Sequence, residues 1–246
     1  MRWVLVLWLF AGCDYLFQLD TVPRVDGGAD AAGSGDAATP VAITFVQAIA
    51  SNTVGQDDTR VATLAADTQD GDLLVAFIAW GFTFSGIASI TDTQGNAYKV
   101  GSQSSHQIVY YAENIHGGPT TLTVQFASST AGPDLRLLEY TGIARDASLE
   151  KAVAQSGSGP AIDSGPLTTQ HAYDVIVAGT SVGAATAGPG PGYIQRLLTS
   201  GNGSIAEDMI ATAAGTYDAT ATQNGSDGDF WSVDALAFRG ASNAPP

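Results

Sequence analysis

The sequence predicts an all-β protein, a two-sheet antiparallel β-sandwich with internally duplicated halves. From Val41 onward, apolar residues recur mostly at every second position, which is the period of a β-strand and not that of a helix. Gly, Asn, Asp and Pro separate these short apolar runs, as they do between the strands of sandwiches and barrels. Several segments of the first half also recur, in the same order, in the second half.

The expected strands can be placed in chain order. Residues 43–45 mark a short strand, and residues 61–64 begin another. Residues 71–78 and 173–178 are continuous apolar runs that follow a turn, which is typical of strands buried on both faces. Residues 121–126 alternate between polar and apolar side chains, as a strand with one solvated face does. Turn sequences separate these strands, at residues 70–71, 94–96, 116–119, 188–192, 224–225 and 227–228.

The two halves are expected to hold equivalent strands, because five short segments match in order at offsets of 94 to 102 residues. The longest match joins residues 72–76 (DLLVA) to residues 174–178 (DVIVA). In this interpretation each half contributes a similar set of strands to one two-sheet sandwich, and Glu113 and Glu207 occupy equivalent places. The other matches are Tyr98 with Tyr193, Ala112-Glu113 with Ala206-Glu207, Thr121-Leu122 with Thr216-Tyr217, and Leu138-Glu139-Tyr140 with Leu236-Ala237-Phe238.

Charge and composition argue against several classes of protein. The chain has 246 residues, 9 Lys and Arg against 24 Asp and Glu, and a net charge of −15. Nucleic acid is not an expected partner, because phosphate binding needs a basic surface. A single cysteine excludes a disulfide framework. One Cys and three scattered His give no metal-ligand spacing, so neither a metal site nor a cofactor is expected.

The first residues predict a lipid anchor. Residues 1–12 hold Arg2 followed by a short apolar run and small residues, which is the pattern of a signal peptide and too short to span a bilayer. The string FAGC, ending at Cys13, resembles the lipobox of bacterial lipoproteins. That resemblance implies that Cys13 is acylated and holds the protein on a membrane of the cell envelope, outside the cytoplasm, with the outer membrane or the cell surface favoured.

The remaining chain divides into three parts. Residues 13–40 carry the lipidated N-terminus and a spacer rich in Asp, Gly and Ala, whose composition favours a flexible tether. Residues 41–240 form the β-sandwich domain, and residues 241–246 are expected to be a disordered tail.

The folded part resembles an uncharacterised jelly-roll-like domain of secreted bacterial proteins. The resemblance covers residues 44–239 and implies an extracellular β-sandwich, which in that family often stands beside adhesin or glycan-active modules. It implies no catalytic motif. The strings that carry it are ITDTQGNAY (90–98), VYYAENI (109–115), TTLTVQF (120–126), PDLRLLEYTGI (133–143), YDVIVAG (173–179) and IAEDMI (205–210).

Aromatic residues are the candidates for ligand binding. Trp80, Phe82 and Phe84 lie on one side of the chain if this segment is extended, and Phe230 and Trp231 follow a turn near the C-terminus. Sugars stack on such rings, because polarised C–H groups of a pyranose meet the negative face of the π system. The alternative interpretation is that the rings close one end of the hydrophobic core.

Four charged residues interrupt strand-like strings: Glu113, Arg136, Glu139 and Glu207. A buried acid needs a partner, so an internal ion pair with Arg136 as the cation is the favoured interpretation. The alternative is a carboxylate pair of a glycosidase, with Asp208 a further candidate. The Asp residues at turns could bind extracellular calcium weakly, although turn formation alone accounts for Asp beside Gly. These turn residues are Asp70, Asp72, Asp92, Asp227 and Asp229.

The functional expectation is a lipid-anchored, non-catalytic envelope protein that displays a β-sandwich. A binding module for extracellular carbohydrate or for a surface protein is favoured. The alternatives are a purely structural or adhesive protein and, ranked last, a glycan-active hydrolase.

Overall fold

A computed structural model describes residues 41–201 and 203–241. The described residues form sixteen β-strands, and they include no helix of the length and apolarity needed to cross a membrane. The first eight strands are β1 (Thr44–Asn52), β2 (Gln56–Thr63), β3 (Leu73–Ala79), β4 (Ile87–Asp92), β5 (Lys99–Gln103), β6 (Gln107–Ala112), β7 (Thr121–Ala131) and β8 (Asp134–Thr141). The next eight are β9 (Leu149–Ser158), β10 (Ala161–Thr169), β11 (Asp174–Val182), β12 (Thr186–Pro189), β13 (Ile194–Leu198), β14 (Ile205–Ala211), β15 (Gly215–Gln223) and β16 (Phe230–Phe238).

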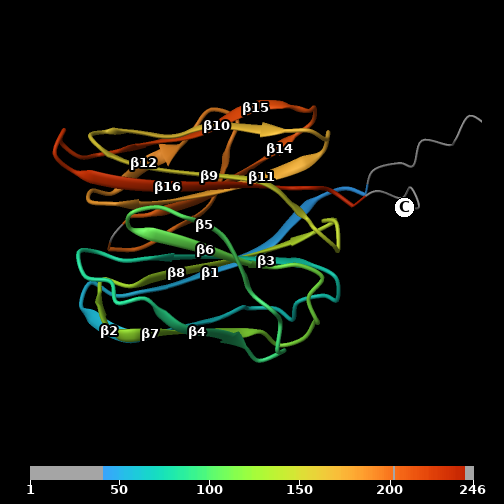
Figure 1. The fold of residues 1–246 in the computed structure, drawn as a ribbon, viewed down its shortest axis with the longest axis horizontal. Coiled ribbons are helices and arrows are strands. Elements are labelled where there is room, and N and C mark those ends of the chain that lie inside the picture. Colours follow the sequence, from blue (N-terminus) through green and yellow to red (C-terminus); the bar gives the residue numbers. More distant parts are fainter. Residues whose placement is uncertain (1–40, 202, 242–246) are drawn as a thin grey trace, which may run out of the picture. The chain divides into compact units, whose positions relative to one another are not determined.

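These strands form four antiparallel sheets that lie in four layers (Figure 1). In the first half, a sheet of order β1-β8-β3-β6-β5 packs on a sheet of order β2-β7-β4. In the second half, the orders β9-β16-β11-β14-β13 and β10-β15-β12 repeat this arrangement strand for strand. The predicted all-β, antiparallel β-sandwich with duplicated halves is therefore confirmed. The expectation that both halves contribute strands to one two-sheet sandwich is wrong, because each half builds a two-sheet sandwich of its own.

The hydrogen-bond register identifies equivalent residues in the two halves. Leu73 pairs with Tyr140 as Val175 pairs with Phe238, so the offsets of 102 and 98 residues found in the sequence hold for these strands. Both halves also carry a bulge at the same place between their fifth and sixth strands. The side-chain hydrogen bond of 3.0 Å between Thr168 and Thr216 repeats the bond of the same length between the equivalent threonines of β2 and β7.

One expected equivalence is wrong. Leu74 pairs with Ala112 and its counterpart Ile176 pairs with Met209, so residues of β6 and β14 are related by 97 positions and not by 94. Glu207 therefore corresponds to Tyr110, and Glu113 lies beyond the end of β6. The two Ala-Glu dipeptides are identical in sequence but are not structurally equivalent, because strand pairing and not local sequence sets the register.

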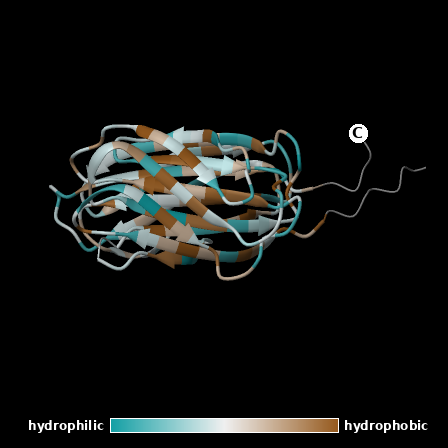
Figure 2. Ribbon diagram, turned by 90° about the horizontal axis from the view of Figure 1, so that it is seen from below, coloured by the Kyte–Doolittle hydropathy of each residue, from teal (hydrophilic) through white to brown (hydrophobic). Residues whose placement is uncertain are grey.

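Three sets of buried side chains hold the layers together. One core lies within the first sandwich and a second, divided into two clusters, lies within the other sandwich. The third fills the junction between the two five-stranded sheets, with residues such as Val75 and Leu138 from the first half against Val177 and Leu236 from the second. Hydrophobic bands cross the strands accordingly (Figure 2). The central sheets are thus buried on both faces, which explains the continuous apolar runs of β3 and β11.

The junction has approximate two-fold symmetry. Tyr111 packs edge-on against Phe238, with ring centroids 5.4 Å apart, and the equivalent pair is Asp208 with Tyr140, joined by a hydrogen bond of 2.7 Å. Such reciprocal contacts are those of an isologous interface. Near the centre, the ring of Phe77 lies against Gly179, its own counterpart, and would be 2.5 Å from a Cβ atom at that glycine.

Candidate functional site

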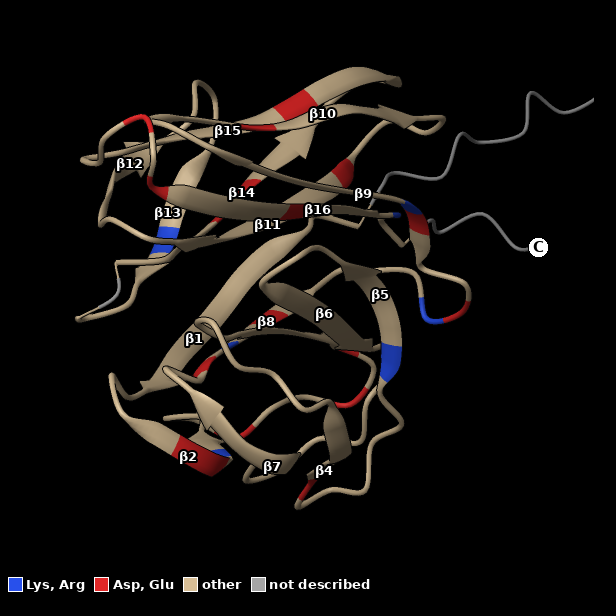
Figure 3. Ribbon diagram, turned by 60° about the vertical axis from the view of Figure 1, so that its left-hand side comes forward, with Lys and Arg blue, Asp and Glu red and all other residues tan. Residues whose placement is uncertain are grey.

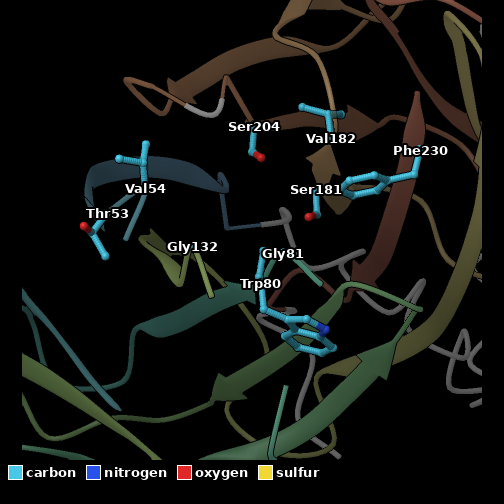
Figure 4. A pocket seen from close by; sticks show the side chains of 10 residues that line it. Thr53, Val54, Trp80, Gly81, Gly132, Ser181, Val182, Ser204 and Phe230 are labelled. Carbon is cyan, nitrogen blue, oxygen red and sulfur yellow. The ribbon is translucent and has the colours of Figure 1, made fainter. Parts of the chain in front are cut away.

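A small cavity lies where the two halves meet at one end of the strands (Figure 4). Its volume is about 200 Å³, which suits a ligand smaller than the drug-sized molecules held by pockets of ~300–1,000 Å³. The first half contributes Thr53, Val54, Ala79, Trp80, Gly81 and Gly132, and the second half contributes Ser181, Val182, Ser204 and Phe230.

Strand ends position the side chains of this cavity. Trp80 directly follows β3, and Phe230 begins β16. In Figure 4 their rings lie on different sides of the cavity, and the hydroxyl groups of Ser181 and Ser204 lie between Phe230 and Val54. The cavity therefore combines aromatic side chains in its walls with hydroxyl groups, which can donate and accept hydrogen bonds.

His106 supports the aromatic wall from behind. Its ring lies 4.4 Å from the ring of Phe230, and its Nδ1 atom is 2.8 Å from the carbonyl oxygen of Gly81. The backbone N–H of His106 also donates to the hydroxyl of Ser232, at 3.2 Å. These contacts join the first half to β16 and hold Phe230 in place.

The three rings of residues 80–84 do not lie on one side, contrary to the expectation for an extended segment. Trp80 is only 5 % exposed and stacks on Phe84, with ring centroids 3.6 Å apart and an interplanar angle of 7°. Phe82 is 89 % exposed and lies edge-on to Phe230 at 5.9 Å. The segment is irregular and ends at Gly86 with φ of +99°, which breaks the two-residue alternation. Trp80 and Phe84 thus belong to the core side, whereas Phe82 faces solvent beside the cavity.

Trp231 does not line the cavity. It is the neighbour of Phe230 on β16, so its side chain points to the opposite face of the sheet, into the second sandwich. A Cβ atom at Gly157 would be 2.5 Å from its indole, and its Nε1 atom is buried without a hydrogen-bond partner. These contacts place Trp231 in the packing of the second sandwich.

Arg136 does not pair with any of the three glutamates proposed as its partners. Its guanidinium is fully buried at the junction, where Nε lies 3.6 Å from Asp134 of the same strand. Nη1 donates to the carbonyl oxygen of Ile205 at 2.6 Å, and Nη2 donates to Gln107 at 2.5 Å. Alternation along β8 turns Arg136 toward the junction and Glu139 toward the other face of the sheet, which separates the two charges.

Each glutamate has its own surroundings. Glu113 forms a salt bridge with Lys99 and accepts hydrogen bonds from the backbone N–H and hydroxyl of Ser148. Glu207 is 1 % exposed and accepts a hydrogen bond from the N–H of Gly190 at 3.3 Å. Burial, with the nearby Asp208 charge, raises the pKa of Glu207 to about 7.

Buried carboxyl groups lie side by side at the start of the third strand in both halves. In the first half, Asp72 and Glu139 are neighbours, and burial raises the pKa of Glu139 to about 7. In the second half, Asp174 and Glu150 are neighbours, and burial together with Glu150 raises the pKa of Asp174 to about 8. Both pairs lie at the opposite strand ends from the cavity, about 25 Å away along β3 or β11. They therefore cannot flank a ligand bound in the cavity.

The acidic turns act as hydrogen-bond acceptors. Asp92 accepts from the backbone N–H groups of Gln94 and Asn96, and Asp229 accepts from the N–H of Ser226. Figure 3 shows acidic residues on strands and turns of both halves, with few basic ones among them. Among the described residues, a group of three or more potential metal ligands forms at Glu150, His171 and Asp174 and at none of these turns.

Sequence reasoning did not find Glu150, His171 and Asp174 as a group, nor the hydroxyl and valine residues of the cavity. The aligned aspartates 72 and 174 were a usable signal, because they mark the same place in both halves. Cys13, the predicted lipidation site, lies outside the described residues, as do the predicted signal peptide and spacer (residues 1–40) and all of the predicted tail 241–246 except Ala241. In comparisons with known proteins, no family model matches the chain, and no curated protein or solved structure is significantly similar to it.

Proposed function

We propose that the protein is a lipid-anchored, non-catalytic component of the cell envelope, held by Cys13, whose β-domain binds extracellular carbohydrate in the cavity between its halves. The observation that carries the proposal is the composition of that cavity: the ring of Phe230 with the exposed ring of Phe82 beside it, together with the hydroxyl groups of Ser181 and Ser204. Aromatic faces suit the C–H groups of a sugar ring, and hydroxyl groups suit its polar edge.

The exposed residues at the cavity favour an extended ligand over an isolated small molecule. Val54 is 84 % exposed and lines the cavity, and Phe82 is 89 % exposed and contacts Phe230. Singly exposed apolar residues are ordinary, but two beside an aromatic cavity form a surface on which neighbouring sugar units would rest. A volume of about 200 Å³ then accommodates one unit of a longer glycan.

The test uses the full-length chain in detergent, first on a glycan array and then by calorimetry with the glycan that the array selects. Phe82→Ala removes a solvent-exposed ring and should leave the unfolding temperature unchanged. Loss of one stacking contact should weaken glycan binding roughly two- to tenfold, equivalent to about 0.5–1.5 kcal/mol. Ile194→Ala is the matched control, because Ile194 is an exposed apolar residue outside the cavity.

Two results would contradict the proposal. If no glycan on the array binds, a structural or adhesive role for the domain takes its place. If a glycan binds but Phe82→Ala and Val54→Asp weaken it no more than Ile194→Ala does, the glycan site lies elsewhere on the protein.

A further inference from the structure

Three potential metal ligands come together at the end of the second sandwich that lies away from the cavity. Glu150 lies in β9, Asp174 begins β11, and His171 lies in the turn between β10 and β11. One ligand atom from each of the three side chains lies within 4.8 Å of those of the other two. The Nδ1 atom of His171 is 2.8 Å from Oε1 of Glu150. One imidazole and two carboxylates form a donor set that Zn²⁺ accepts.

The carboxylate of Asp174 has few partners. Its residue is 0 % exposed, and neither of its two oxygens has a donor in good hydrogen-bonding geometry. The backbone N–H of Gly240 and the charge of Arg239 lie near it and favour its charged form, but burial and Glu150 outweigh them. Oε2 of Glu150 is likewise buried without a hydrogen-bond partner. Burying a carboxylate without donors or a cation is costly. Because an oxygen of Asp174 lies near the ligand atoms of Glu150 and His171, a cation shared by the three side chains would offset the cost of burying these carboxyl groups.

The equivalent place in the first half is satisfied only in part, because Oδ2 of Asp72 is also buried without a hydrogen-bond partner. There Glu139 accepts hydrogen bonds from Gln47 Nε2 at 2.7 Å and from the N–H of Gln69 at 3.3 Å. By register, the position of Gln47 is taken in the second half by Lys151, whose side chain is exposed. In the second half the N–H of Gln170 donates to Glu150 at 2.8 Å, as the N–H of Gln69 does to Glu139. The halves differ in the side chain beside this acid, which is the Gln47 amide in the first half and the His171 imidazole in the second.

We propose that Glu150, His171 and Asp174 bind one divalent transition-metal ion of the zinc class. Ligand atoms around a tetrahedral Zn²⁺ at ~2.0–2.1 Å lie about 3.3 Å from one another, so small rotations of the side chains bring these three into place. His171 is exposed and leaves the fourth coordination position open to solvent. The two positive charges of the ion balance the two carboxylates. Calcium is disfavoured, because it takes six to eight oxygen ligands.

A shared proton is the competing explanation. Asp174 in its protonated form can donate to Glu150, which would satisfy the pair without a metal. The two explanations differ in the role of His171: zinc needs its nitrogen as a ligand, whereas a shared proton between two carboxyl groups does not.

The experiment measures Zn²⁺ binding to the purified full-length chain after its metal has been removed with a chelator. Zn²⁺ alone is titrated in competition with a chromophoric chelator, and bound zinc is counted by elemental analysis. The variants are His171→Ala and Asp174→Asn, and the matched controls are His116→Ala, which removes another exposed histidine, and Asp72→Asn, which alters the equivalent aspartate. We expect one zinc per chain in the wild type and in both controls. Since loss of a residue that merely orients a ligand costs ~10–100-fold in affinity, loss of His171 should cost about 100-fold or more.

His171 is exposed, so its replacement leaves the fold intact and circular dichroism verifies this. The proposal is overturned if the wild type binds no stoichiometric zinc, in which case the shared proton is the explanation. It is also overturned if His171→Ala binds zinc as tightly as His116→Ala does, because the ion then sits elsewhere. Displacement of zinc by an equal concentration of Ca²⁺ would overturn the assignment to the zinc class.

Discussion

Replacing Arg136 by alanine should severely destabilise the protein, because this guanidinium is fully buried between the two halves. It donates across the junction to the carbonyl oxygen of Ile205 and, within the first half, to Gln107. The carboxylates of Asp134 and Asp234 lie near it and favour its charge. The substitution removes the cation and leaves these buried acceptors behind.

The expected loss is about 3–5 kcal/mol, the usual cost of removing one partner of a buried ion pair. Each buried acceptor that loses its donor adds up to ~1–3 kcal/mol, although these effects do not simply sum. Since domains are stable by only ~5–15 kcal/mol, the variant should lie close to unfolding. Arg145→Ala, in an exposed loop, is the control and should change stability by less than ~0.5 kcal/mol.

The penalty should also depend on pH. Burial raises the pKa of Asp134 and of Asp234, and the Arg136 charge opposes this rise, so without Arg136 both pKa values go higher. An acid whose pKa is raised in the folded state binds its proton more tightly when the protein is folded than when it is unfolded. Its protonation therefore stabilises the fold at low pH, and this contribution is lost as the pH rises. The cost of Arg136→Ala should therefore be smaller at pH 5 than at pH 8, measured by urea unfolding followed by tryptophan fluorescence. A penalty equal to that of Arg145→Ala, or one that is the same at both pH values, would refute the reasoning.

Three further outcomes are expected. The pKa of Glu207 is raised from 4.5 to about 7 in the folded protein, so this group lowers the stability of the fold as the pH rises from about 4.5 through 7. In the same urea assay, Glu207→Gln should therefore be more stable than the wild type by up to ~3 kcal/mol at pH 8 and equal to it at pH 4. Gly179→Ala places a methyl group 2.5 Å from the ring of Phe77 and should lower the free energy of unfolding by ~1–3 kcal/mol. In a double-mutant cycle, adding Phe77→Leu should restore part of that stability, and additive effects of the two substitutions would contradict the contact. Cys13→Ala should move the protein from the detergent phase to the aqueous phase in a phase-partition assay, and equal partitioning of both forms would exclude the lipid anchor.

Much of the fold could be predicted because local sequence carries it. The two-residue period follows from strand geometry, and the buried runs 73–79 and 174–182 follow from sheets that are covered on both faces. The segments 138–140 and 236–238 also aligned, because they pair with these runs in the same register. The match between Glu113 and Glu207 was misleading, because the register of a strand depends on pairing partners that are distant in sequence. A dipeptide does not identify those partners.

The site could be predicted less well, because its chemistry depends on contacts across the junction. Arg136 bonds to Ile205 of the other half, a partner that no local pattern specifies. The stacking of Trp80 on Phe84 depends on an irregular segment between two strands, where alternation gives no guidance. His171 appeared to be an ordinary turn residue until the fold placed Glu150, 21 positions away, beside it.

Phe77 and Gly179 occupy the same position in two copies of one sandwich, yet one has an aromatic ring and the other has no side chain. In a dimer of identical chains, a residue at the two-fold axis meets itself, so ring faces ring or glycine faces glycine. Fusion of the two copies into one chain removes this restriction, which permits a large residue opposite a small one and Arg136 near its counterpart Asp234. First and second halves are consequently complementary to each other and not to themselves. If two chains exchange halves during refolding, they should form intertwined dimers that pair unlike halves, whereas two first halves alone should not associate.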